Sequence, residues 1–115
     1  PLACRAALAV LDIFEHDNVI AANRVKAIEF TRILAEVSAH SRVRHFRHLG
    51  MIWAFDVADA TPGFSARFHR RALAHGVFIR PIGNTVYVMP PYVTSADEMR
   101  GLADTVMICL DHPEV

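Results

Sequence analysis

The pattern of hydrophobic and polar positions divides the first third of the 115-residue chain into two helical segments of different character. Residues 2–15 are apolar around almost the whole circumference of a helix, interrupted only by Arg5, Asp12 and Glu15. Residues 18–39 predict an amphipathic helix, and Asp17 is suited to cap it. Its apolar stripe recurs at steps of three and four and consists of Ile20, Ala21, Val25, Ile28, Ile33, Leu34 and Val37. A helix that is apolar all round must be covered on all sides. The first segment therefore predicts a partner outside this domain, either more of the same chain or another subunit.

From Ser41 onward the pattern indicates alternating strands and helices. Residues 42–49 and 51–57 predict two strands, and residues 64–75 predict a basic helix that Gly76 ends. Two β-rich runs flank Pro81-Ile82-Gly83-Asn84 and predict a tight hairpin. Ser95-Ala96-Asp97-Glu98 has the form of a capping box and opens a last helix that runs to about Asp111. This order predicts an α+β fold, with a small, mainly antiparallel sheet backed by helices.

Composition and charge narrow the function classes. Apolar residues make up 53% of the chain, which argues against disorder. Twelve basic and twelve acidic residues cancel, so the net charge argues against nucleic acid and membrane surfaces as partners. We see no apolar run of transmembrane length and no signal peptide, so we expect a cytoplasmic protein. Cys4 and Cys109 then read as buried, reduced thiols rather than a disulfide framework.

Three constellations that carry chemistry elsewhere have plainer explanations here. His45-x-x-His48 lacks a cysteine or carboxylate to complete a metal site, so we expect no metal. The arginines in the middle of the chain could mimic a nucleic-acid patch, but a solvated basic face or a subunit interface fits the balanced charge better. Lys26 is the only lysine and therefore the only possible Schiff-base residue. It lies on the polar face of its helix, so we expect a solvated surface residue and no catalytic or cofactor-binding side chain.

Arg80 is the residue for which a functional role competes with a structural one. It ends an apolar, β-rich run directly before Pro81 and the turn, which places its cation at the rim of the sheet. The planar guanidinium fork fits a carboxylate with two parallel hydrogen bonds. The sequence therefore favours Arg80 as an anion-binding residue, with an exposed strand-end arginine as the alternative.

The same stretch resembles a known family. Gly76-Val77-Phe78-Ile79-Arg80-Pro81-Ile82-Gly83-Asn84 and Val86-Tyr87-Val88-Met89-Pro90-Pro91-Tyr92 are similar to the C-terminal segment of the class III pyridoxal-phosphate aminotransferases, in particular the branch that acts in biotin synthesis. Pro1-Leu2-Ala3-Cys4-Arg5-Ala6-Ala7 and Leu49-Gly50-Met51-Ile52 resemble further parts of that segment. The resemblance covers the whole chain.

The resemblance implies that residues 1–115 form the small C-terminal domain of a fold-type I enzyme that depends on pyridoxal 5'-phosphate. Enzymes of this branch convert 8-amino-7-oxononanoate to 7,8-diaminononanoate. The family's Schiff-base lysine, cofactor-contacting aspartate and phosphate-binding loop would lie in a large domain that precedes Pro1. The resemblance further implies that Arg80 holds the carboxylate of the keto-amino acid substrate, that the parent enzyme is a homodimer, and that this fragment binds no cofactor and is inactive alone.

Two alternatives stay open at this point. The chain could come from another class III aminotransferase, such as one acting on ω-amino acids. It could also be a stand-alone α+β module that binds a ligand or a protein. Because the chain begins at Pro1 and enters a helical pattern at once, we expect an excised piece of a longer gene product.

Overall fold

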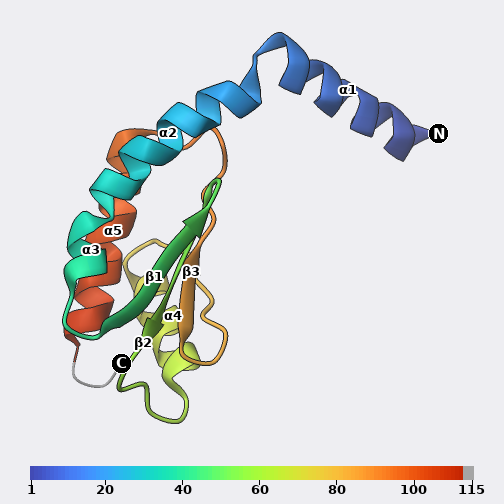
Figure 1. The fold of residues 1–115 in the computed structure, drawn as a ribbon. Coiled ribbons are helices and arrows are strands. Elements are labelled where there is room, and N and C mark those ends of the chain that lie inside the picture. The colour runs from blue at the N-terminus through green and yellow to red at the C-terminus, as the bar shows by residue number, and fades with distance from the viewer. Residues whose placement is uncertain (113–115) are drawn as a thin grey trace.

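The computed structural model of the protein describes residues 1–112 and consists of helices, a small sheet and a projecting arm (Figure 1). The elements in chain order are α1 (Leu2–His16), α2 (Val19–Ile33), α3 (Ala35–Ala39), β1 (Val43–Leu49), β2 (Ile52–Val57), α4 (Phe64–Ala74), β3 (Thr85–Val88) and α5 (Ala96–Asp111). The predicted α+β class is confirmed. None of the helices within residues 1–112 has the length and apolar character needed to cross a lipid bilayer.

The sheet has the order β1-β2-β3 with both pairs antiparallel. Along β2 the side chains of Trp53, Phe55 and Val57 are buried, while Ala54 and Asp56 between them are half-buried. Alternate residues of a strand point to opposite faces. One face of the sheet therefore forms the core with residues of α2, α4 and α5, and the other face is left open by the described residues.

Helix α1 projects from the body as an arm (Figure 1). Asp17 and Asn18 join it to α2, and the backbone of Asn18 is left-handed with φ of 48°. No residue of α1 is buried, and the ring of Phe14 packs edge-on against Tyr92 at 5.9 Å between centroids. The predicted cap at Asp17 is wrong: Asn18 is the N-cap residue of α2, and no side chain caps that helix.

The second predicted helix is divided, and half of its predicted apolar stripe is exposed. Leu34 leaves the helical pattern between α2 and α3. The buried face is formed by Ala27, Phe30, Leu34 and Val37, whereas residues 20, 25 and 28 of the predicted stripe are exposed. The sequence shows two candidate apolar faces on this segment, and only the one that includes Phe30 is covered, by α5 and by Trp53 of β2.

The predicted hairpin around Pro81 is only partly correct. Residues 77–81 form no strand, and an isolated bridge between Ile82 and Thr85 is what is left of the hairpin. Proline has no backbone N–H to donate to a sheet. The carbonyl groups of Ile79 and Pro81 instead accept hydrogen bonds from side chains of α4, those of His69 and Ser65. The segment is thus fastened to a helix rather than to β3.

Other local predictions are confirmed. Ser95 accepts from the Glu98 N–H while the Glu98 carboxylate accepts from the Ser95 N–H, which completes the capping box of α5. Gly76 ends α4 in a left-handed conformation with φ of 79°. Trp53 lies in the core at 1% exposure. The expectation of two buried thiols is half wrong, because Cys109 is buried and Cys4, on the arm, is exposed.

Candidate anion-binding site

A cavity of about 540 Å³ opens beside the end of β3. Three segments wall it: the chain that follows α4, the end of β3 with the proline loop beyond it, and the first turns of α5. The lining residues are Gly76, Val77, Phe78, Ile79, Arg80, Tyr87, Val88, Met89, Pro90, Pro91, Thr94, Glu98 and Leu102. The cavity is mostly apolar, and its charged side chains are those of Arg80 and Glu98.

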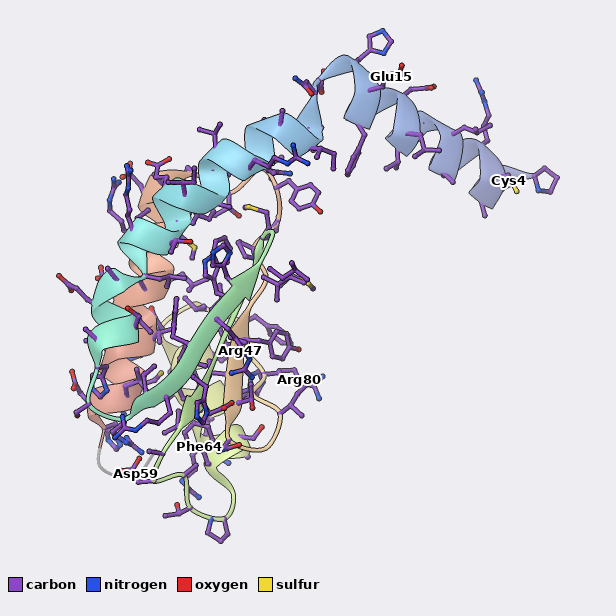
Figure 2. The ribbon with its side chains drawn as sticks, in the orientation of Figure 1. Cys4, Glu15, Arg47, Asp59, Phe64 and Arg80 are labelled. Carbon is purple, nitrogen blue, oxygen red and sulfur yellow. The ribbon has the colours of Figure 1, made fainter. Side chains whose placement is uncertain are left out.

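Arg80 reaches this position because its two neighbours are buried. Ile79 and Pro81 both point into the protein, and in an extended segment the residue between them must point outward. The side chain of Arg80 is exposed and projects away from the helices (Figure 2). No side chain or carbonyl group among residues 1–112 pairs with it. Its guanidinium donors are therefore open to an anion from outside the domain.

Among the described residues Glu98 forms no ion pair with Arg80, and its carboxylate is held by Ser95 instead. One carboxylate oxygen accepts from the Ser95 backbone N–H at 2.7 Å and from the Ser95 hydroxyl at 2.8 Å. These hydrogen bonds, the backbone one foremost, lower the pKa of Glu98 below its usual value. The cavity lining thus combines an apolar body with the unpaired guanidinium of Arg80, the charged carboxylate of Glu98 and the side chain of Tyr87. Such a site suits a ligand with a hydrocarbon chain that ends in a carboxylate.

A second polar cluster, which we did not predict, lies on the open face of the sheet. Asp56 accepts hydrogen bonds from the Thr85 hydroxyl at 2.7 Å and His45 Nδ1 at 3.0 Å, and it pairs with Arg47 at 3.4 Å. These contacts, that of Thr85 foremost, lower the pKa of Asp56 to about 2. The cluster depends on a bulge in β1, where the register shifts between Arg44 and Arg47 and His45 takes a φ of 51°.

The histidine pair and the arginine-rich middle of the chain do not gather into one site. His45 binds Asp56, whereas the ring of His48 stacks on Trp53 at 6.0 Å. Arg42 and Arg47 form ion pairs with different aspartates, Asp59 and Asp56. Within residues 1–112 no group of three or more histidine, cysteine, aspartate or glutamate side chains is placed to hold a metal ion.

Lys26 is not the solvated residue that we expected. Its side chain is half-buried, and its ammonium group donates to the carbonyl oxygens of Tyr92 at 2.5 Å and Thr94 at 3.2 Å. Sequence reasoning missed this role because the acceptors are backbone atoms more than 60 residues away.

Comparison with known proteins shows that the chain is similar to aminotransferases. Residues 1–110 match the family model described as aminotransferase class-III. The chain is 36% identical to the adenosylmethionine-8-amino-7-oxononanoate aminotransferase of Helicobacter pylori, covering 96% of this chain and 26% of that protein. It is 34% identical to the Geobacter sulfurreducens enzyme of the same name, covering 90% of this chain and 25% of the relative.

A solved structure shows the same fold. The crystal structure of adenosylmethionine-8-amino-7-oxononanoate aminotransferase from Methanocaldococcus jannaschii superposes with a TM-score of 0.82 at 28% identity, over 93% of this chain and 26% of that one. The chain therefore has the small α+β domain fold of a fold-type I enzyme. It spans about a quarter of the length of the curated relatives it matches.

Proposed function

The chain belongs to the class III aminotransferase family, and from this we propose that residues 1–115 are the C-terminal small domain of a longer pyridoxal-phosphate enzyme. The proposed reaction transfers an amino group to 8-amino-7-oxononanoate and gives 7,8-diaminononanoate, a step of biotin synthesis. Adenosylmethionine is the proposed amino donor. The keto substrate and the amino donor are taken from the names of the Helicobacter pylori and Geobacter sulfurreducens relatives described above.

The observation that carries the proposal is the unpaired Arg80 at the mouth of a mostly apolar cavity. The proposed keto substrate has a hydrocarbon chain that ends in a carboxylate, and the cavity offers apolar walls and one free guanidinium to such a molecule. Arg80 would hold the carboxylate and so fix the distance of the reacting carbon from the remainder of the active site. Restricting the substrate in this way lowers the entropic part of the barrier.

The described residues do not fit the cofactor. A Schiff-base lysine needs a free amine in a desolvated or charge-tuned pocket, and Lys26, the only lysine, is held by two carbonyl groups. We therefore propose that pyridoxal 5'-phosphate is bound by a large domain of the same parent chain, and that the parent is a homodimer. This chain's own part is to bind and orient the substrate.

The test replaces Arg80 in the full-length parent enzyme. A charge-assisted hydrogen-bond pair to a carboxylate contributes roughly 1.5–3 kcal/mol. Arg80→Ala should therefore lower kcat/KM for the keto acid by about 10- to 100-fold. Arg80→Lys should restore only part of the loss, because a point charge lacks the fork. Steady-state kinetics of the parent enzyme should also compare 8-amino-7-oxononanoate with an ω-amino acid as substrate. A higher kcat/KM for the first would distinguish the proposed reaction from those of other class III aminotransferases.

Two controls make the result specific. Arg70→Ala removes an exposed arginine from the outer side of α4 and should leave kcat/KM unchanged. A matched ketone without the carboxylate should be insensitive to Arg80→Ala. If Arg80→Ala leaves kcat/KM for the keto acid within twofold of the parent value, Arg80 is a surface residue and the proposed substrate site is wrong.

The cofactor part of the proposal has its own measurement. We expect the 115-residue chain alone to bind pyridoxal 5'-phosphate weakly and to show no transaminase activity, because Lys26 is occupied. Absorbance titration followed by dialysis measures this. A stoichiometric cofactor adduct that survives dialysis would contradict the proposal that the large domain, and not this one, binds the cofactor.

A further inference from the structure

The proline loop, residues 90–94, forms one wall of the cavity that Arg80 borders, and it has little internal support. Pro90 and Pro91 have no backbone N–H to donate, and the loop's own hydrogen bond runs from the Thr94 N–H to the Pro91 carbonyl at 3.0 Å. Val93 is 89% exposed and packs on nothing that would hold the loop. Pro90 is buried and anchors the start of the loop, whereas the exposed residues 91–93 need support from outside the loop.

Lys26 provides that support from α2. Its ammonium group donates to the carbonyl oxygens of Tyr92 and Thr94 at 2.5 and 3.2 Å, so one side chain bridges the two residues on either side of the exposed Val93. An ammonium has three donors and no acceptor. Two converging carbonyl groups therefore suit it, and hydrogen bonds to a charged group are stronger than neutral ones.

The same loop residue also meets the arm. The ring of Tyr92 packs against Phe14 of α1, while its carbonyl accepts from Lys26. No residue of α1 is buried, so the contact between Phe14 and Tyr92 is one of the few that hold the arm against the body. The position of Tyr92 therefore affects both the cavity wall and the arm. Lys26 thus acts at a point where α1, α2 and the proline loop meet.

We propose that Lys26 is a positioning residue for the Arg80 site: by clamping the Tyr92 and Thr94 carbonyl groups it holds the proline loop as a wall of the cavity. The proposal rests on the proposed function, since it takes the cavity as the substrate-carboxylate site. Lys26 touches neither Arg80 nor the cavity itself, so it acts through the loop.

The experiment compares Lys26→Met with the parent in the full-length enzyme. Methionine keeps the apolar stem of lysine and removes the donors. We expect KM for the keto acid to rise about three- to tenfold with kcat within twofold, because the loop shapes binding of the non-reacting end of the substrate. Amide hydrogen exchange should quicken at Thr94 and stay unchanged at Phe55 in β2. Lys26→Arg, which keeps donors and charge, should restore at least half of the change in KM.

The matched control is Arg24→Met, which removes an exposed cation from the same helix and should alter neither KM nor the Thr94 amide. Should Lys26→Met aggregate, Lys26→Gln replaces it in both measurements. An unchanged KM or an unchanged Thr94 amide in the Lys26 variant overturns the proposal. If the Thr94 amide quickens but neither Lys26→Met nor Arg80→Ala alters KM, it is the substrate site that is wrong, and with it the positioning role.

Discussion

Asp56 organises the open face of the sheet through three different neighbours. A carboxylate has acceptor sites enough for all of them, and Thr85 from β3, His45 and Arg47 from β1 converge on it from both adjacent strands. Each contact favours the charged form, which is why the pKa of Asp56 falls from 3.8 to about 2. Asp56 thus ties the three strands together on the side that the helices do not cover.

This lowered pKa makes stability depend on pH. A group whose pKa is depressed by folding stabilises the protein above its unfolded pKa and ceases to do so as pH falls through its folded pKa. We expect the free energy of unfolding to drop between about pH 4 and pH 2. Asp56→Asn should lower that free energy by about 1–2 kcal/mol at pH 7. It should also flatten the acid limb, which is the decline of the free energy of unfolding below about pH 4. Urea unfolding across this pH range measures both effects.

Asp104→Asn is the matched control for that experiment. It removes the same charge from an exposed position on α5, so it should change neither the stability at neutral pH nor the shape of the acid limb. Thr85→Val, which removes the foremost cause of the lowered pKa, should reproduce part of the Asp56 effect. An acid limb that is the same in Asp56→Asn as in the parent would show that this carboxylate is not the group responsible.

Residues differ in how far the sequence alone reveals them. The exposure of Arg80 agrees with the sequence, because its neighbours Ile79 and Pro81 are buried, but the strand predicted to place it at the rim of the sheet does not form. Its role as an anion-binding residue stays a prediction. The hydrogen bonds of Lys26 and the cluster around Asp56 could not be predicted. Both depend on partners distant in the chain, and the second also depends on a strand bulge that no local signal marks.

At the scale of elements, α5 is the helix whose start is best defined. Ser95 and Glu98 satisfy each other's backbone groups in the first turn, where N–H groups otherwise lack partners. Ser95→Ala should lower the free energy of unfolding by about 1 kcal/mol. Ser41→Ala, at an exposed serine outside the helices, should cost much less. Chemical denaturation of the two variants side by side measures the difference, and equal stabilities would argue against the capping box.

Elements with strong local signals could be predicted, and those set by competition for backbone partners could not. The capping box fixed α5, and Gly76 fixed the end of α4. The strand predicted before Pro81 has the right composition, but His69 and Ser65 of α4 take its carbonyl groups. For α2 the deciding factor is side-chain packing instead: two apolar faces are available, and contact with α5 and Trp53 selects the one that includes Phe30.

At the scale of the whole molecule, the arm carries a long apolar surface. Leu2, Leu8, Val10, Leu11 and Ile13 are all more than half exposed, at 85, 52, 51, 63 and 53%. Large apolar surfaces that are exposed to this extent mark interaction sites. The sequence-based prediction that this helix needs a partner therefore stays a prediction, now with a defined surface.

We expect the 115-residue chain to self-associate in solution through this surface. Light scattering over a concentration series should show a mass that rises above the monomer, since burial contributes roughly 25 cal/mol for each Å² of apolar area. A variant with Leu8→Glu and Leu11→Glu should be much closer to a monomer at the same concentration. A parent chain that stays monomeric at high concentration would mean that α1 folds back onto its own domain.

The left-handed residue at Asn18 has a consequence for recombination between related enzymes. Exchanging a segment between two homologues is tolerated best where the junction cuts few contacts, and the chain before Asn18 contributes no buried residue to the domain that follows. A crossover at this residue would carry the helices and sheet across as one cooperative unit. Asn18 is therefore the position at which we expect a crossover between homologous chains to be tolerated best.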